Sequence, residues 1–382
     1  MRKGWEYKRF DEVFDLQMGK TPDRKNPEYF GGNNVWVSIR DLGDKEIADS
    51  NEHITDLAVS NSNIRKVKRG TVIMSFKLTV GKCGIAATDL YTNEAIMAFN
   101  TKESFDINSS FLYYYLQCYH WVGSNKAVMG TTLNKATISK QYISIPPLST
   151  QLAIVSELDK INELIRLKKE QLKDFDNLAQ SLFYEMFGDP VENERGWEVK
   201  KLGEVGELAR GVSKHRPRNA PELLGGSMPL IQTGDVANSD FYITKYSSTY
   251  SKLGVEQSRV WEAGTLCITI AATIGKCAIL GFTACFPDSV VGYKPNNEAN
   301  AIYMYFIFKN MQKMLEEFAP GVAQKNINLK ILSNLSIPLP PLSLQRLFAQ
   351  RIEQIEREKS EVQKSIQDLE TLLASRMQYW FE

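Results

Sequence analysis

The sequence predicts an α+β protein in which two mixed α/β domains, related by a pseudo-twofold axis, are separated by two long antiparallel coiled-coil helices. Two observations lead to this prediction. Much of the first half of the 382-residue chain recurs in the second half. Each half also ends in a heptad pattern that is sustained over about four heptads. The recurrence predicts two like domains, and the heptads predict the helices between them.

The internal repeat consists of matches that keep their order along the chain. The Gly-Trp-Glu of residues 4–6 recurs at 196–198, an offset of 192, and the Gly-Lys-Cys of 81–83 recurs at 275–277, an offset of 194. At the end of each copy, Pro147, Leu148, Ser149 and Gln151 match Pro341, Leu342, Ser343 and Gln345. Solenoid repeats are only about 20–50 residues long. The period therefore indicates one duplicated domain with its connector.

Within each copy, β-branched runs bounded by glycine predict strands, and longer apolar runs predict helices. The expected strands are 35–39, 71–76, 229–233 and 265–270, and the expected helices are 110–119 and 300–314. Four aromatic residues of the first of these helices are more typical of a core than of a base-stacking platform: Phe111, Tyr113, Tyr114 and Tyr115.

A proline pair ends each domain and precedes a long helix. The expected order is a domain at 1–148, a helix at 149–188, a domain at 189–342 and a helix at 343–382. Ser149 or Thr150 is expected to cap the first helix and Ser343 the second. About 38 residues at 1.5 Å each give a length of about 57 Å. Because the first helix leaves the first domain and the second helix begins at the second domain, a pair of them must be antiparallel.

The apolar seams occupy matching positions in the two helices, with steps that alternate between three and four. The residues predicted to form the helix-pair interface are Leu158, Ile161, Ile165, Leu172, Phe175 and Leu182 in the first helix, and Ile352, Ile355, Val362, Ile366, Leu369 and Leu373 in the second. A single helix on a domain surface is the alternative interpretation. The length, without an internal proline or glycine, favours a pair.

Composition limits the class of protein. With 46 Lys and Arg against 45 Asp and Glu, the net charge of +1 gives no global indication of nucleic-acid binding, so any basic surface must be local. No segment approaches the about 18 uncharged apolar residues that span a bilayer, and we expect a cytoplasmic protein. The five cysteines are not spaced as metal ligands and are expected to be reduced and buried, and only three histidines occur. We expect no metal site.

Catalytic motifs are absent from the sequence. Gly81-Lys82 and Gly275-Lys276 lack the upstream glycine of a phosphate-binding loop, and no Gly-x-Gly-x-x-Gly or Gly-x-Ser-x-Gly is present. The proline pairs lack the polar side chain that holds an exocyclic amine in amino-methyltransferases. The Glu-x-Lys of residues 6–8 and 198–200 is more typical of an exposed strand start than of a nuclease. The sequence therefore favours a binding protein over an enzyme.

Local basic segments remain as candidate binding surfaces. Residues 62–82 carry six Lys or Arg and no acid, and residues 209–218 carry four and no acid. Such loops suit phosphate neutralisation, and Asn, Gln, Lys and Arg suit base edges, although the same residues also form ordinary surface turns. The candidate DNA-binding residues are Lys20, Thr21, Arg24, Lys25, Arg40, Lys77, Lys82, Thr131, Asn134 and Lys135 in the first copy, and Lys214, Arg216, Arg218, Thr273, Lys276, Gln324, Lys325 and Asn326 in the second.

Together these features resemble the specificity subunit of type I restriction–modification systems. The resemblance rests on Ile-Pro-Pro-Leu-Ser-x-Gln at 145–151, Leu-Pro-Pro-Leu-Ser-x-Gln at 339–345, and the segments 19–22, 26–32 and 35–37 that open the first copy. It covers essentially the whole chain. The second copy departs from the opening motif at residues 211–214 (Gly-Val-Ser-Lys), as is expected of recognition domains.

The resemblance implies that each domain is a target recognition domain that reads one half of a split double-stranded DNA sequence. The helices would set the spacer and dock two modification subunits, which bind S-adenosylmethionine, and restriction subunits would use ATP and Mg²⁺. The chain itself would hold no cofactor and no catalytic residue. Two alternatives stay open on the residues alone. One is a coiled-coil interaction adaptor without DNA binding, and the other is an enzyme, which would need clustered carboxylates in one copy.

Overall fold

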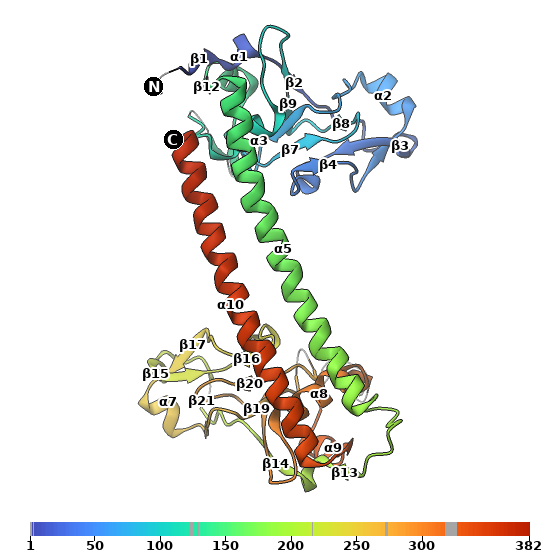
Figure 1. The fold of residues 1–382 in the computed structure, drawn as a ribbon, viewed down its shortest axis with the longest axis vertical. Helices are drawn as coiled ribbons and strands as arrows, with labels where there is room; N and C mark the ends of the chain where they lie inside the picture. Colours follow the sequence, from blue (N-terminus) through green and yellow to red (C-terminus); the bar gives the residue numbers. More distant parts are fainter. Residues whose placement is uncertain are drawn as a thin grey trace. The chain divides into compact units, whose positions relative to one another are not determined.

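The computed structural model describes residues 2, 4–122, 133–215, 217–271, 274–317 and 327–382, and the backbone of 125–127 and 130–132. The chain divides into two compact units. The first unit comprises Met1–Lys169 with Lys364–Glu382, and the second comprises Glu170–Gln363. Each unit thus contains one copy of the repeat and about half of each long helix, and both are drawn in Figure 1.

The first unit contains a five-stranded mixed sheet of order β2-β9-β6-β7-β4, a three-stranded sheet β5-β3-β8, and a pair β1-β12. The strands are β1 (Glu6–Arg9), β2 (Phe14–Met18), β3 (Phe30–Val37), β4 (Glu46–Ile47), β5 (His53–Ile54), β6 (Val72–Ser75), β7 (Cys83–Ala86), β8 (Tyr91–Thr92), β9 (Ile96–Thr101), β10 (Asn125–Ala127), β11 (Gly130–Thr132) and β12 (Tyr142–Ile145). The helices are α1 (Phe10–Val13), α2 (Asp56–Ser62), α3 (Ser109–Cys118) and α4 (Lys135–Ser139).

The second unit repeats this topology, with sheets β14-β22-β19-β20-β16, β17-β15-β21-β18 and β13-β23. The strands are β13 (Val199–Lys201), β14 (Gly206–Arg210), β15 (Leu224–Leu230), β16 (Tyr242–Ile243), β17 (Ser248–Tyr250), β18 (Val260–Trp261), β19 (Leu266–Thr269), β20 (Cys277–Leu280), β21 (Ala284–Cys285), β22 (Val290–Pro295) and β23 (Ser336–Pro338). The helices are α6 (Thr233–Ala237), α7 (Lys252–Glu256), α8 (Ala301–Glu317) and α9 (Leu329–Ser333). The five-stranded sheets have the same strand order in both units, and the smaller sheet has one more strand, β18, in the second; the repeat is therefore a structural duplication.

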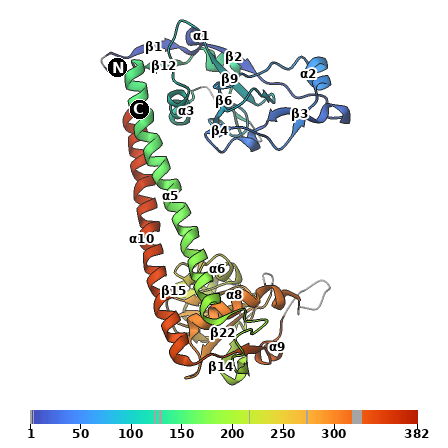
Figure 2. The same cartoon turned by 45° about the vertical axis from the view of Figure 1, so that its right-hand side comes forward.

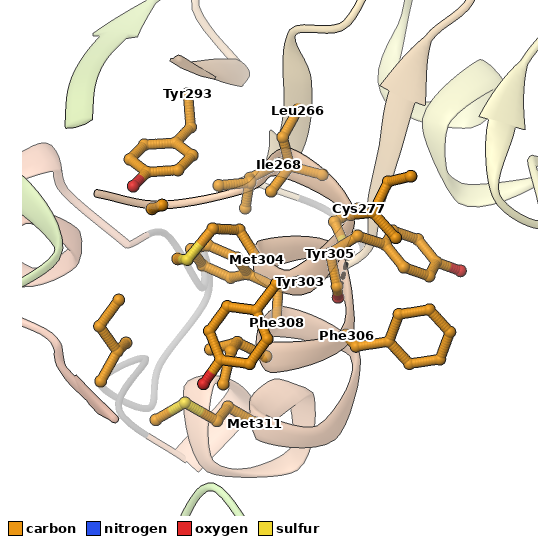
Figure 3. Close-up of a cluster of buried hydrophobic side chains, with 14 of the residues drawn as sticks. Leu266, Ile268, Cys277, Tyr293, Tyr303, Met304, Tyr305, Phe306, Phe308 and Met311 are labelled. Atoms are coloured by element: carbon orange, nitrogen blue, oxygen red, sulfur yellow. Dashed lines mark hydrogen bonds between the residues drawn. The ribbon is translucent and has the colours of Figure 1, made fainter. Parts of the chain in front are cut away.

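One apolar helix covers the five-stranded sheet in each unit. Figure 2 shows α3 beside the sheet of the first unit, where it packs on β6 and β7. In the second unit α8 packs on β19 and β20, and its side chains Tyr303, Met304 and Phe306 meet Leu266 and Ile268 in a shared core (Figure 3). The aromatic residues Phe111, Tyr114 and Tyr115 of α3 are buried. As expected, the cluster is core.

Two strand predictions were displaced. The second-copy strand expected at 229–233 is β15, Leu224–Leu230, and α6 begins at Thr233. The first-copy counterpart begins at Phe30, five residues before the expected start at Val35. In both, a glycine pair lies inside the strand, with Gly31 and Gly225 at a φ of +80°. Glycine adopts this backbone without steric cost and here allows a bulge.

The long helices are α5 (Leu148–Phe187) and α10 (Leu342–Phe381), each continuous (Figures 1 and 2). They pair in antiparallel fashion within each unit. In the first unit Arg376 forms an ion pair with Glu157, and Glu370, earlier in α10, pairs with Lys169, later in α5, at 2.9 Å. All the predicted interface residues are buried or half-buried. The predicted pairing therefore agrees with the packing inside each unit.

The helix caps were wrongly predicted. Both helices begin one residue earlier than expected, at Leu148 and Leu342, so the three hydroxyl residues lie inside the first turn. The proline carbonyl begins the hydrogen bonding instead: Pro147 O accepts from Gln151 N at 3.0 Å, and Pro341 O accepts from Gln345 N at 3.2 Å. Pro147 and Pro341 thus occupy the N-cap positions, where the backbone carbonyl accepts the first bond of the helix.

A buried glutamine joins each long helix to its domain. Gln151 is fully buried, donates from Nε2 to Asp106 O and Pro146 O at 3.0 Å each, and accepts from Asn108 N at 2.8 Å. Gln345 makes the equivalent three bonds to Glu298 O (3.1 Å), Pro340 O (2.8 Å) and Asn300 N (2.9 Å). Asn108 and Asn300 in turn cap α3 and α8. The glutamine of the repeated motif therefore satisfies backbone groups that would otherwise be buried without partners.

Within the described part of the chain, no helix is long and apolar enough to cross a membrane. The five cysteines are free thiols, four of them buried and Cys118 half-buried. Burial raises the pKa of Cys118 to about 11 and that of Cys277 to about 12. These thiols behave as small core side chains.

Candidate nucleic-acid interface

Three loops that are far apart in sequence meet in the first unit. Gly19 N donates to Ile96 O at 3.1 Å, and Phe76 N donates to Ala95 O at 2.9 Å. Leu133 N then donates to Phe76 O at 2.8 Å. These bonds tie the segments 19–26, 76–82 and 133–135 to the turn between β8 and β9. We call this set loop cluster 1.

The second unit builds the same arrangement with the same kind of bonds. Gly211 N donates to Val290 O at 2.9 Å, Ile270 N donates to Ser289 O at 3.1 Å, and Ile327 N donates to Ile270 O at 3.1 Å. They gather the described residues of 211–218, 270–276 and 327–328 at the turn between β21 and β22. We call this set loop cluster 2. Most of the predicted DNA-binding residues belong to these two clusters.

The first loop of each cluster depends on a glycine. A Cβ on Gly19 would lie 2.2 Å from the backbone oxygens of Thr92 and Asn93, and a Cβ on Gly211 would lie 2.0 Å from Phe286 O. Real side chains do not approach backbone this closely. The loop can therefore reach the turn only where the side chain is a hydrogen, which explains why this glycine occurs in both copies.

The basic loop of cluster 1 presents exposed Lys20, Arg24 and Lys25. The Arg24 guanidinium lies 5.1 Å from the Phe30 ring and 5.0 Å from the Trp36 ring, and it donates to both Glu52 oxygens, at 2.6 and 3.0 Å. The hydrogen bonds from Arg24 hold the pKa of Glu52 below its usual range, and those to Glu52 raise the pKa of Arg24. Arg24 is thus a fixed, stacked cation that already has a partner.

The other predicted residues of the first unit occupy different settings. Thr21 donates its hydroxyl to Glu94, and Arg40 lies exposed directly after β3. Lys77 lies 5.5 Å from the Phe76 ring, whereas the Lys82 amine donates to Leu42 O at 2.8 Å, away from the basic loop. Lys135 is exposed at the start of α4. The side chain of Thr131 lies outside the described residues.

Asn134 has a structural role that the sequence prediction missed. Its Oδ1 caps α4 by accepting from Thr137 N at 2.8 Å, so this oxygen is not available to a base edge. In the second unit Asn328 caps α9 in the same way, accepting from Ile331 N at 2.9 Å. The structural counterpart of Asn134 is therefore Asn328, 194 residues later. Gln324, Lys325 and Asn326 lie outside the described residues.

In loop cluster 2, Arg218 is paired as Arg24 is. Its Nη2 lies 2.7 Å from Asp288 Oδ1 and 2.8 Å from Oδ2. The neighbouring Lys214 donates its backbone N–H to Gln257 Oε1 at 2.6 Å and leaves its side chain exposed. Lys276 instead lines a pocket of about 300 Å³ with Lys309 and Lys359 of the second unit. Arg216 and Thr273 lie outside the described residues.

The carboxylates of these clusters were not predicted. Glu94 and Asp288 stand at an offset of 194 and so occupy the same place in the repeat. The sequence shows this shared acidic position, but it does not show that the acid contacts a basic loop. Thr21 and Glu94 are 73 positions apart, and Arg218 and Asp288 are 70 apart. Each cluster therefore combines exposed cations with a carboxylate, on a surface built by backbone hydrogen bonds.

The helix pair carries a second set of polar contacts. In the second unit Lys359 is buried in the seam, with Nζ 2.7 Å from Asp176 Oδ1 and 3.2 Å from Glu356 Oε1. Burial raises the pKa of Glu356, and the bonds to the two carboxylates raise that of Lys359 although burial opposes the shift. No group of three or more His, Cys, Asp or Glu side chains in the described residues is placed to hold a metal ion.

Comparison with known proteins fits this geometry. The model of the type I restriction modification DNA specificity domain matches residues 2–174 and 194–371. The type I restriction enzyme MjaIX specificity subunit of Methanocaldococcus jannaschii is 24% identical over 378 residues, covering 91% of this chain and 85% of that protein. The HindI specificity subunit of Haemophilus influenzae is 26% identical over 163 residues, covering 41% of this chain and 35% of that protein.

Solved structures share the fold. A chain from a study of complex assembly and conformational transition of the type I R-M system superposes with a TM-score of 0.67 at 19% identity, covering 100% of this chain and 98% of that chain. The type I S subunit from M. genitalium gives a TM-score of 0.56 at 15% identity, covering 98% and 95%. The chain thus contains two copies of one domain, each of which gathers separate loops at one turn. By its matched residues, the chain belongs to the type I restriction modification DNA specificity domain family.

Proposed function

We propose that this chain is the specificity subunit of a type I restriction–modification complex, in which each unit reads one half of a bipartite double-stranded DNA target. The observation that carries the proposal is the same three-loop cluster in both units, tied together by equivalent backbone hydrogen bonds. A duplicated surface suits two half-sites, each contacted by its own set of loops. Exposed Lys20 and Lys25 in the first unit and Lys214 in the second suit phosphate contacts.

The proposal extends to the helix pair and to the partner subunits. The helices α5 and α10 set the spacer between half-sites and dock two modification subunits, and restriction subunits join that complex. In this scheme S-adenosylmethionine binds the modification subunits, ATP and Mg²⁺ serve the restriction subunits, and the chain itself is a non-catalytic component that acts in the cytoplasm. The net charge of +1 leaves much of the phosphate-facing charge to the partners.

Co-expression with the modification subunit, followed by methylation mapping of genomic DNA, tests the proposal. We expect a split motif with a methylated adenine in each half. A chimaera in which residues 1–148 come from another family member changes one half of that motif and keeps the other. A stable complex without methylation would favour an interaction adaptor, and a change in both halves would contradict the modular scheme.

Spacer length tests the helices separately. Insertion of one helical turn into the middle of both α5 and α10 lengthens the unread gap of the motif while both half-sequences persist. The matched control inserts the turn into α5 alone, which breaks the register with α10 and is expected to abolish methylation. An unchanged gap with the double insertion would show that the helices do not set the spacer.

A further inference from the structure

One basic segment of the first unit lies outside the three loops of cluster 1. Residues 64–70 read Ile-Arg-Lys-Val-Lys-Arg-Gly. Ile64 and Val67 are buried, whereas the four cations between and after them are exposed. We call these four cations the basic ridge: Arg65, Lys66, Lys68 and Arg69. The two buried apolar side chains thus anchor the segment while all four charges face solvent.

Hydrogen bonds fix the backbone of the basic ridge. Val67 N donates to Leu90 O at 2.8 Å, and Leu90 N donates to Val67 O at 3.0 Å. On the other side Gln17 of β2 donates from Nε2 to Arg65 O at 3.1 Å and to Lys66 O at 3.3 Å. The ridge is therefore attached to both β2 and the strand segment that leads into β8, and its charges project from a fixed backbone.

The basic ridge keeps an excess of positive charge after its own ion pair is counted. Asp89 Oδ2 lies 3.1 Å from Lys68 Nζ and 4.0 Å from Lys66 Nζ, and Asp89 Oδ1 accepts from Arg69 N at 3.0 Å. In the described part of the chain, neither Arg65 nor Arg69 has a hydrogen-bonded or ion-paired side chain. Four cations against one carboxylate leave a net charge of +3 on this surface.

The second unit has the same backbone at this place but not the same charge. The pairing of Trp261 with Ala284 repeats that of Val67 with Leu90 at an offset of 194. The four positions of the ridge are occupied there by Arg259, Val260, Glu262 and Ala263. One cation and one carboxylate cancel, and Arg259 is also paired with Glu207 at 3.0 Å. The fold therefore does not require the charges, and the basic ridge belongs to the first unit.

The basic ridge adjoins loop cluster 1. Lys20 N, in the basic loop, donates to Thr92 O at 2.8 Å. Thr92 is two residues along the chain from Leu90, the pairing partner of the ridge, and this corresponds to about 7 Å in extended backbone. Each strand of B-DNA carries one charge for about every 3.4 Å of helix axis. The ridge can thus reach phosphates about two nucleotides beyond those that the basic loop reaches.

We propose that the basic ridge is a further DNA contact of the first unit, which binds the phosphate backbone beside the half-site and reads no base. This inference rests on the proposed function. Exposed Lys and Arg on a fixed backbone suit phosphate oxygens, and phosphate contacts carry no sequence information. A protein partner fits less well, because protein interfaces are depleted in lysine and have an apolar centre. Both large apolar side chains of the segment are buried.

The test uses the full chain with co-expressed modification subunits and two duplex probes, one with the mapped target and one of random sequence. Arg65→Gln combined with Arg69→Gln removes two cations. On both probes the slope of log affinity against log salt should become shallower by about two units, since each phosphate contact contributes about 0.9. The ratio of wild-type to variant affinity should therefore shrink about tenfold between about 50 and 200 mM salt. The methylated motif should stay the same.

A hydroxyl-radical footprint on the target duplex locates the contact. The chimaera of residues 1–148 identifies the half that the first unit reads. Protection of the backbone beside that half should shrink in the double variant, while protection beside the other half should persist. A footprint that is unchanged, or that shrinks equally beside both halves, would contradict the assignment to the first unit.

The control is Lys8→Gln combined with Lys102→Gln, which removes two positive charges elsewhere in the same unit. Lys102 directly follows β9, six residues and about 20 Å along the strand from Ile96 at the turn of loop cluster 1. Lys8 lies in β1, six residues before β2 begins. This variant should leave the slope and the footprint near wild type. An equal loss of slope would mean that net charge alone is responsible, and it would overturn the inference.

Two other results would also overturn the inference. A change in the methylated motif would mean that the ridge reads bases, and weaker binding of the modification subunits in the absence of DNA would mean that it contacts protein. If the wild-type complex binds both probes and methylates a split motif but the double variant keeps the wild-type slope, only this inference fails. If the wild-type complex binds no DNA, both the proposed function and this inference fail.

Discussion

The two units share a topology but differ in the polar contacts where domain and helix meet. In the first unit Asp159 of α5 accepts from Lys45 Nζ and from Tyr114 Oη, each at 2.5 Å. In the second unit Tyr305 donates to a backbone carbonyl, and the charge lies inside the helix seam at Lys359. The residue that matches Lys359 at an offset of 194 is the buried Ile165.

The comparison separates the features that both copies share from the features that differ between them. The order of the five-stranded sheet, the buried glutamines and the loop glycines agree in both units, because each satisfies backbone groups or fits a backbone contact of this fold. Exposed or half-exposed charged contacts can diverge because such a pair contributes little to stability. Lys359 is different, because it is buried and its removal leaves Glu356 without that partner. The predictions below therefore separate shared features from those that belong to one unit.

The largest effect is expected at the glutamines. Gln151→Leu and Gln345→Leu each leave a backbone N–H and two carbonyls without a partner in a buried site, and each should lower the free energy of unfolding of its unit by about 3 kcal/mol. Hydrogen exchange of α3 and α8 reports the two units separately. The exposed Gln367→Leu is the control and should change little. If the two variants lost clearly different amounts of unfolding free energy, the two buried glutamines would not be equivalent.

The loop glycines should give the next largest effect. Gly19→Ala and Gly211→Ala place a methyl group against backbone oxygens, and overpacking of this kind costs about 1–3 kcal/mol. We expect the amides of residues next to Ile96 or Val290 to lose protection from hydrogen exchange. Each variant should also lose recognition of one half-site. Gly43→Ala is the control, because a Cβ there meets no atom within 4 Å. Normal methylation by either variant would contradict the role of that glycine in holding its loop against the turn.

The buried lysine should show a difference between the units. Lys359→Met removes the partner of the half-buried Glu356 and should destabilise the second unit by about 2 kcal/mol, less than for a fully buried pair because Asp176 is exposed. Adding Glu356→Gln to Lys359→Met should recover part of the loss. The paired substitution Ile165→Lys in the first unit should be destabilising as well, because it moves an ammonium group into a buried apolar position of the seam. A stable Lys359→Met variant with unchanged urea midpoint would refute this account.

The smallest effect concerns pH. Hydrogen bonds from Arg376 lower the pKa of Glu157, so its contribution to stability is present above the ordinary glutamate pKa of 4.5 and is lost as the pH falls through the folded value. Burial raises the pKa of Glu356, so the folded second unit gains relative stability as the pH falls through that raised value. NMR titration of the carboxyl groups should give a pKa below 4.5 for Glu157 and a pKa above 4.5 for Glu356. The reverse order would contradict both assignments.

The sequence by itself determined the duplication, the two long helices and their seams. These are local or periodic features: an offset of 192 to 194 is read directly from the chain, and a heptad stripe must be buried wherever the helix packs. It also located surface cations such as Lys20, Lys25 and Lys214, since cationic segments near glycine turns lie at the surface; that they contact DNA stays a prediction. The prediction of hydroxyl caps was wrong because each helix begins one residue earlier, and the residue before its first turn is a proline rather than a serine or threonine.

Only the tertiary structure decided which partners the candidate side chains have. Arg24 and Glu52 are 28 positions apart, and Gln345 meets Glu298 across 47. No periodicity relates such residues, and their pairing follows from sheet order and loop closure, which depend on the whole chain. The structure likewise assigned Asn134 to a helix cap and brought three separate loops to one turn in each unit. Contacts of this kind arise from packing, and a linear pattern carries no record of them.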